Sequence, residues 1–192
     1  MARIVDRVGM VKLKPRRLPP YESIVHAIIH QQLSGQAAAS ILARFKTAFG
    51  AGGYPPADVV AGIDVETLRG AGLSRAKAAY VKDVAGKSLA GAIPTLEKCD
   101  SLTDAELIAR LTSIKGVGRW TVEMLLIFNL GKPDVLPIHD LGVRRGFQRA
   151  YGKRALPEPK QLEKFGKQWG PFRTTASLLL WRAADFPKDG QW

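Results

Sequence analysis

The sequence is poor in cysteine and has no long apolar run. Its single cysteine, Cys99, excludes an internal disulfide, a four-cysteine zinc site and a four-cysteine iron–sulfur cluster. No stretch approaches the roughly 18 consecutive apolar residues that a transmembrane helix needs. The residues after Met1 also lack the continuous apolar core of a signal peptide. We therefore expect an intracellular protein that does not contact a membrane.

Acidic residues are scarce relative to basic ones. The chain has 17 Asp and Glu against 29 Lys and Arg, which gives a net charge of +12. An excess of this size usually has a polyanion as its partner, and nucleic acid is the default, although a surplus for solubility is the alternative. The basic residues gather in the first 17 positions and again over residues 144–154. Charge therefore predicts binding, but it says nothing about chemistry.

Strand patterns and internal repeats are absent, whereas helical patterns are frequent. Apolar residues recur at helical spacing after Pro20 and within residues 74–90, 103–111 and 174–184. Residues 119–130 are apolar nearly all round, which predicts a buried helix. We expect an all-α fold of roughly eight to ten short helices. Residues 1–17 are expected to form a basic N-terminal arm, and residues 18–192 a single domain.

Residues 114–118, with the sequence Ile-Lys-Gly-Val-Gly, lie between two predicted helices. Glycine on either side of one apolar residue permits a tight turn with positive φ. The helix that follows begins with unpaired N–H groups and a partial positive charge, which together bind a phosphate. Val117 is expected to pack between the two helices. A plain turn between antiparallel helices is the alternative for such a short pattern.

The flanking sequence points to a family. Residues 111–122 resemble the helix-hairpin-helix of the superfamily of base-excision glycosylases that pair this hairpin with a Gly/Pro-rich loop and an aspartate. Residues 130–146, which contain Asp140, resemble that second element. Together with residues 31–34 and 72–77, they are most similar to the alkylated-base (3-methyladenine) DNA glycosylase II subfamily. The resemblance covers roughly residues 18–184. It implies two helical lobes flanking a DNA-binding cleft, in a minimal form without the N-terminal sheet domain of some relatives.

The resemblance assigns the catalytic role to Asp140. A glycosylase breaks an N-glycosidic bond through a transition state with positive charge on the sugar, and a nearby carboxylate stabilises that charge and orients water. The alternative is that Asp140 caps its helix, and both roles are compatible. Asp134 is expected to be a turn residue. Members that also cleave the backbone carry a lysine where this chain has Trp120, so we expect a monofunctional enzyme that leaves an abasic site.

The target base must leave the duplex, and aromatic faces offset part of that cost, more so for a cationic alkylated base. Trp120 and Trp181 are the stacking candidates that the resemblance implies, with packing in the core as the alternative for each. Met124 stands where better-known bacterial relatives have a tyrosine, so it keeps an apolar wall but loses a ring. His139, beside Asp140, is a candidate for orienting water or contacting DNA.

Two further groups of residues are predicted to contact DNA. Gln32 and Leu33 occupy the loop that fills the gap left by the flipped nucleotide in relatives, although a simple loop with Leu33 turned inward is the alternative. The hairpin and the second basic cluster supply the other contacts, from Lys115, Gly116, Val117, Gly118, Arg119, Arg144 and Arg145.

The expected partner is double-stranded DNA with alkylated bases, bound by a monomer in the bacterial cytoplasm with its nucleoid or in a eukaryotic nucleus. We predict no cofactor and no metal site, apart from a monovalent cation at the hairpin that the resemblance implies. Glu22, His26 and His30 share a helix face, but a fourth ligand is not apparent. Two rival functions stay open. One is a glycosylase for oxidised or mismatched bases, and the other is a non-catalytic helix-hairpin-helix module that binds DNA.

Overall fold

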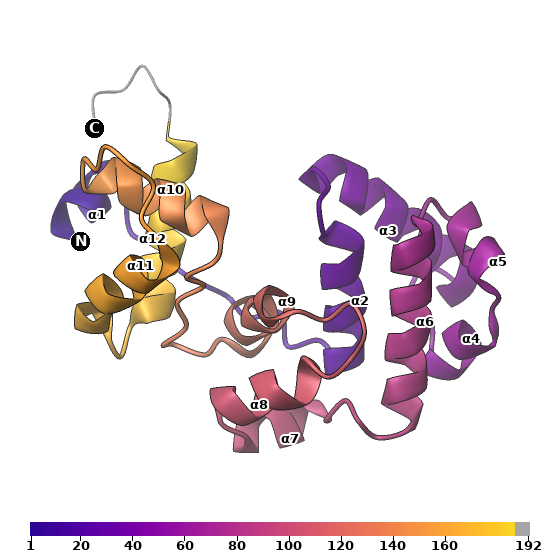
Figure 1. The fold of residues 1–192 in the computed structure, drawn as a ribbon. Helices are drawn as coiled ribbons and strands as arrows, with labels where there is room; N and C mark the ends of the chain where they lie inside the picture. Colours follow the sequence, from indigo (N-terminus) through magenta and orange to yellow (C-terminus); the bar gives the residue numbers. More distant parts are fainter. Residues whose placement is uncertain (187–192) are drawn as a thin grey trace. The chain divides into compact units, whose positions relative to one another are not determined.

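A computed structural model describes residues 1–186, and this part of the chain is helical without a strand (Figure 1). The all-α prediction is therefore confirmed. The chain divides into two compact units. The first, which we call the hairpin unit, is Arg16–Leu125, and the second, the aspartate unit, combines Met1–Pro15 with the chain from Leu126 onward. The predicted cleft between two lobes stays a prediction. Within the described residues, no helix is long and apolar enough to cross a lipid bilayer.

The hairpin unit is built around α6, whose buried Ala78, Val81, Val84 and Ala85 lie on one face of the helix. That helix contacts α2, α4 and α5, while α2 also contacts α3 and α9, and α8 contacts α9 (Figure 1). The helices of this unit are α2 (Pro20–His30), α3 (Gly35–Gly50), α4 (Ala57–Gly62), α5 (Val65–Gly70), α6 (Arg75–Leu89), α7 (Leu96–Ser101), α8 (Asp104–Leu111) and α9 (Arg119–Met124).

The aspartate unit is built around α12, which packs against α10 and α1. Its core holds Val143 and Phe147 from α10 together with Leu179, Leu180 and Ala183 from α12. Its elements are α1 (Ala2–Val8), the π-helical η1 (Leu125–Leu130), α10 (Leu141–Ala150), α11 (Pro159–Gly166), the 3-10 turn η2 (Lys167–Trp169) and α12 (Arg173–Asp185). The segment from residue 131 to residue 140 has no regular structure, and we call it the aspartate loop.

Local signals in the sequence explain where several helices begin. The hydroxyl of Ser34 accepts a hydrogen bond from the N–H of Ala37, and the hydroxyl of Ser74 accepts one from Lys77, so each serine caps its helix. Thr103 and Glu106, three residues apart, form a capping box at the start of α8. Asp140 caps α10 by accepting a hydrogen bond from the N–H of Val143.

Two parts of the chain differ from expectation. The predicted basic arm contains a helix, α1, because Ile4 is buried in the core of the aspartate unit and gives that segment an apolar anchor. The helix expected over residues 119–130 is α-helical to Met124 and then continues as a π-helix. π-helical turns inside α-helices are often found at functional sites.

Candidate functional site

The hairpin between α8 and α9 has the geometry that its sequence predicts, with one correction. Val117 is 3% exposed, so it is buried, as expected for a residue that packs inside the hairpin. Gly116 has a φ of 82°, and a Cβ there would meet the ring of Tyr80 at 2.3 Å. Gly118 has an ordinary φ of −83° and caps α9. Only the first of these two glycines therefore needs positive φ.

The residues of the hairpin differ in which of their side-chain and backbone groups are exposed and which already have a partner within the protein. Lys115 has an exposed side chain, but its backbone N–H donates to Oδ2 of Asp83 at 3.2 Å. Gly118 and Arg119 are exposed at the start of α9, where Gly118 has no side chain to cap the first N–H groups. Nε of Arg119 donates to the buried carboxylate of Glu123 at 2.9 Å. One nitrogen of this guanidinium is therefore used in a contact within the protein. The start of α9 thus presents N–H groups that no side chain of the N-cap residue covers, and their binding to a phosphate stays a prediction.

The loop of residues 31–34, which we call the wedge loop, is tied to the hairpin and to α6. Nε2 of Gln31 donates to the carbonyl oxygen of Gly116 at 3.2 Å and to Oγ1 of Thr121 at 3.1 Å. Nζ of Lys77 donates to the carbonyl oxygens of Ile29 at 2.8 Å and of Gln31 at 2.6 Å. Sequence reasoning gave no role to Gln31 or Lys77, because the signal depends on how α6 and the hairpin pack.

The tip of the wedge loop faces outward. Gln32 adopts a φ of 56°, in the left-handed region that non-glycine residues seldom occupy. Leu33 is 40% exposed, which excludes the alternative in which it turns inward. A cavity of about 650 Å³ lies beside Gln32, and its lining includes Gln31, Lys77, Tyr80 and residues 112–118. The structure therefore brings the predicted wedge and the predicted phosphate site to one cavity.

In the aspartate unit, Asp140 is fixed by two hydrogen bonds to the same carboxylate oxygen. Oδ1 of Asp140 accepts from the backbone N–H of Val143 at 2.8 Å and from Nε1 of Trp181 at 2.8 Å. Gly142 allows the indole to approach, because a Cβ there would lie 2.7 Å from Cδ1 of Trp181. Both alternatives for Asp140 are thus compatible, since it caps α10 and also stays partly exposed.

Trp181 does something that the sequence did not predict. Its ring lies 5.5 Å from the ring of Phe128, centroid to centroid, and its N–H holds the carboxylate of Asp140. A donor at this distance fixes the orientation of the carboxylate. Trp181 therefore orients Asp140, while its predicted stacking on a base stays a prediction.

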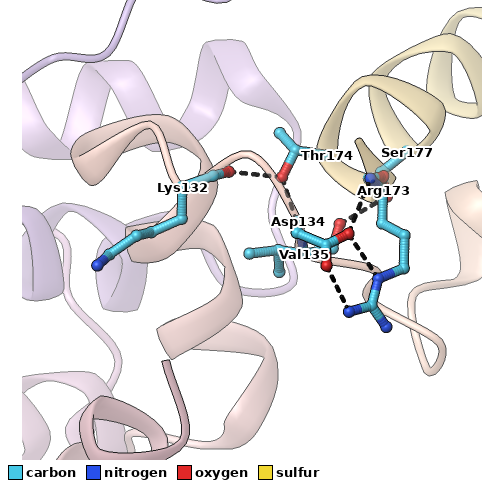
Figure 2. A network of polar contacts seen from close by, with 6 residues as sticks. All are labelled: Lys132, Asp134, Val135, Arg173, Thr174 and Ser177. Atoms are coloured by element: carbon cyan, nitrogen blue, oxygen red, sulfur yellow. Dashed lines mark hydrogen bonds and ion pairs between the residues drawn. The ribbon is translucent and has the colours of Figure 1, made fainter. Parts of the chain in front are cut away.

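The aspartate loop is fastened to the start of α12 (Figure 2). Asp134 forms a two-point ion pair with Arg173, with Nε and one terminal nitrogen each 2.7 Å from a carboxylate oxygen. The guanidinium hydrogen bonds hold the pKa of Asp134 below its ordinary value. The prediction of a turn residue missed this pair, because Arg173 lies 39 residues further along the chain.

Of the remaining predicted site residues, some have exposed side chains and others already contact the protein. His139 and Arg145 are exposed, whereas Nε of Arg144 donates to the carbonyl oxygen of Pro157 at 2.8 Å and is half-buried. Arg144 therefore has a structural contact that competes with its predicted role on DNA. Trp120 is 36% exposed in the hairpin unit, and Met124 is partly buried there. That these two line one pocket with Trp181 stays a prediction.

The histidines of α2 pack against each other. The rings of His26 and His30 stack with centroids 4.0 Å apart, and Nδ1 of His26 lies 3.0 Å from the hydroxyl of Tyr54. Burial, followed by the charge of His30, lowers the pKa of His26 to about 4, so it is neutral at pH 7. Among residues 1–186, no group of three or more His, Cys, Asp or Glu side chains is placed to hold a metal ion.

The family follows from comparison with known proteins. Residues 25–172, which include both the hairpin and Asp140, match the model of the HhH-GPD superfamily of base excision DNA repair proteins. The chain belongs to this superfamily. This HhH-GPD protein is 40% identical over 193 aligned residues to DNA-3-methyladenine glycosylase 1 of Schizosaccharomyces pombe, covering 97% of this chain and 84% of that protein.

Two solved structures resemble this HhH-GPD protein along most of its length. The 3-methyladenine DNA glycosylase of Schizosaccharomyces pombe in complex with abasic DNA has a TM-score of 0.86 and 39% identity, covering 94% of this chain and 89% of that chain. The DNA-3-methyladenine glycosidase of Bacillus halodurans has a TM-score of 0.84 and 34% identity, covering 96% and 84%. The fold and motifs predicted from the sequence are therefore those of the superfamily.

Proposed function

We propose that this protein excises alkylated bases such as 3-methyladenine from double-stranded DNA by hydrolysing the N-glycosidic bond. The observation that carries the proposal is the carboxylate of Asp140, which the N–H of Val143 and the indole of Trp181 hold at the start of α10. A carboxylate fixed in this way is suited to stabilising positive charge on a sugar. The relatives named for 3-methyladenine excision, at 34–40% identity, support the choice of substrate.

Different residues of the chain bind the DNA, fill the space left by the base and assist the reaction. The hairpin binds a phosphate through the first N–H groups of α9, and Gln32 and Leu33 fill the space that the extruded base leaves. The charged carboxylate of Asp140 then stabilises the developing positive charge on the sugar and orients or deprotonates the attacking water. Alkylation makes the base a good leaving group, so the site needs little acid catalysis. The product is an abasic site.

A hydrolytic reaction without backbone cleavage follows from Trp120. Lyase members of the superfamily carry an amine nucleophile at this position, and an indole cannot attack the sugar carbon. We expect no covalent complex to be trapped by borohydride on alkylated DNA. Any trapped complex would overturn this part of the proposal, and its loss or persistence in Lys115→Ala would show whether Lys115 is the nucleophile.

We also propose that the hairpin carbonyls bind a monovalent cation, as the family resemblance implies. The carbonyl oxygens of Ile114 and Gly116 accept hydrogen bonds from Val117 and Gln31. A carbonyl oxygen has two lone pairs, so these bonds leave an acceptor position for a cation. No protein side chain is needed for such a site. A second, separate proposal concerns localisation. Because the proposed substrate is DNA, we propose that the protein acts in the nucleoid of a bacterium or in the nucleus of a eukaryote.

The decisive experiment measures base release from alkylated duplex DNA, with alkali used to reveal abasic sites. We expect release by the wild type, and loss of release in Asp140→Asn, which keeps the cap acceptor but not the charge. Glu163→Gln, at an exposed carboxylate on α11, is the matched control and should keep wild-type activity. Release from oxidised or mismatched DNA alone would change the substrate class. DNA binding without release from any lesion would favour a non-catalytic module.

A further inference from the structure

One side of α12 faces the aspartate loop along its length. Thr174, Ser177 and Trp181 follow at spacings of three and four residues, which places them on a single face of the helix. Thr174 and Ser177 are buried, at 4% and 0% exposed. Each of the three side chains bonds to the loop or to its last residue, Asp140. A polar stripe on a mostly apolar helix therefore has a defined partner.

Thr174 makes the most contacts at the beginning of the loop (Figure 2). Its hydroxyl donates to the carbonyl oxygen of Lys132 at 2.6 Å and accepts from the N–H of Val135 at 3.0 Å. Its own backbone N–H donates to the carbonyl oxygen of Pro133 at 2.9 Å. One residue thus satisfies three backbone groups of a segment that has no regular structure of its own.

Ser177 and Arg173 add two further attachments. The hydroxyl of Ser177 lies 3.1 Å from the carbonyl oxygen of Val135 and 2.8 Å from that of Arg173, so its one proton is shared between the loop and the helix. Arg173 pairs with Asp134 through its guanidinium, and its backbone N–H donates to the same carboxylate at 3.2 Å. The first half of the loop is therefore held by three residues that lie within little more than one turn at the start of α12.

The second half of the loop ends at Asp140, where Trp181 of the same helix holds the carboxylate. Leu136 and Ile138 pack against the core of the aspartate unit between these two points, and Pro137 is buried. Because these residues are packed, a displacement of the loop at its contacts with Thr174 is expected to displace Asp140 as well. A single rigid helix sets both ends of the segment.

We propose that Thr174 is a positioning residue for Asp140, and that α12 serves as a template that sets the place of the carboxylate through Thr174 at one end and Trp181 at the other. The inference depends on the proposed function, because it assigns Thr174 to the placement of the carboxylate that acts in base excision. Thr174 itself touches neither the sugar nor the base. Its effect reaches the reaction through the loop.

The variant Thr174→Val tests the proposal, because valine has nearly the shape of threonine and removes the hydroxyl. A misplacement of about 1 Å costs on the order of 100-fold in rate. We expect the single-turnover rate of base release to fall by roughly 10-fold to 100-fold, while the Kd for duplex DNA with an abasic site stays at the wild-type value. Thr174→Ser, which restores the hydroxyl, should recover most of the rate.

Thr175→Val is the matched control, since residue 175 makes the same substitution one position along the helix and about 100° around it. It should release bases at the wild-type rate. A folded Thr174→Val that also works at the wild-type rate would overturn the proposal. An equal loss in Thr174→Val and Thr174→Ser would do the same, because it would show that the hydroxyl is not what matters.

A second readout separates this inference from the proposed function. The four tryptophans give four indole N–H signals in a ¹⁵N-labelled sample, and Trp181→Phe identifies the signal of Trp181. We expect Thr174→Val to shift or broaden that signal and Thr174→Ser to leave it in place. If the wild type releases no base, the proposed function fails, while a shifted Trp181 signal still supports the template. An unmoved signal in a folded Thr174→Val contradicts the template whatever the activity.

Discussion

Nε1 of Trp181 donates to Oδ1 of Asp140 at 2.8 Å, and the same oxygen accepts the N–H of Val143 at 2.8 Å. The two donors come from different helices, α12 and α10, so the carboxylate is oriented by the packing of the pair. Gly142 provides the space that the indole needs. The tryptophan therefore contributes a polar contact where the sequence suggested an aromatic surface.

The first prediction concerns Trp181→Phe, which keeps an aromatic ring and removes the donor. A hydrogen bond to a charged group contributes about 1.5–3 kcal/mol. We expect base release to slow by roughly 10-fold to 100-fold and DNA affinity to change little. Phe128→Leu is the control, since it removes the ring that Trp181 contacts and leaves the donor. If both variants lose the same activity, packing rather than the hydrogen bond is responsible.

The second prediction concerns Lys77→Met, which removes the ammonium group that donates to the carbonyl oxygens of Ile29 and Gln31. Without these bonds the wedge loop loses its attachment to α6. We expect the affinity for duplex DNA with an abasic site to fall by about 5-fold to 10-fold, equivalent to roughly 1 kcal/mol, as for a typical hydrogen bond. Titration by fluorescence anisotropy measures the change.

Lys82→Met is the matched control for Lys77→Met. Lys82 lies on the same helix and donates to the carbonyl oxygen of Ile63 at 2.6 Å, away from the wedge loop. Both variants should lower the Tm by similar amounts, and only Lys77→Met should weaken DNA binding. Equal binding losses in the two would trace the effect to general stability.

The sequence predicted those features that depend on neighbours in the chain. The cap at Asp140 needs a partner three residues away, and the hairpin depends on a local glycine pattern. The contacts of Lys77 and Trp181 cross 46 and 41 residues. They depend on the rotation of a helix about its axis, which the apolar pattern sets within one or two positions at best. Such contacts appear only once the helices are packed.

The third prediction concerns pH and Asp134. The hydrogen bonds of Arg173 lower the pKa of this carboxyl in the folded state, so the folded protein binds the proton less well than the unfolded chain. The pair therefore stabilises the fold above the unfolded pKa of about 3.9, and the stabilisation is lost as pH falls through the folded pKa. The gain is modest because both side chains are partly exposed, at 30% and 37%.

Urea unfolding of the wild type and Asp134→Asn at pH 7, 5, 4 and 3 measures this effect. We expect the variant to have the lower free energy of unfolding at pH 7, and the difference to shrink below about pH 4. Asp185→Asn, at an exposed carboxylate near the end of α12, should show no such convergence. A constant difference across the series would mean that the charge of Asp134 does not contribute.

The fourth prediction separates the two glycines of the hairpin. Alanine at position 116 must adopt a φ of 82° and place its Cβ 2.3 Å from the ring of Tyr80, so the turn has to move. Alanine at position 118 keeps an ordinary φ and meets no atom within 4 Å. We expect Gly116→Ala to lose about 1–3 kcal/mol of stability, as overpacked sites do, and at least 10-fold in DNA affinity.

Gly118→Ala should cost about 1 kcal/mol or less in stability, because position 118 is the N-cap of α9, where alanine is less favourable than glycine. Denaturant titration and DNA binding at fixed salt test both variants in parallel. The double variant Gly116→Ala, Tyr80→Ala removes the clash but keeps the unfavourable φ, so it should recover part of the binding. If it recovers none, the backbone conformation of Gly116 matters more than the close contact with Tyr80. If Gly118→Ala is the more damaging change, the assignment of the positive φ to Gly116 is wrong.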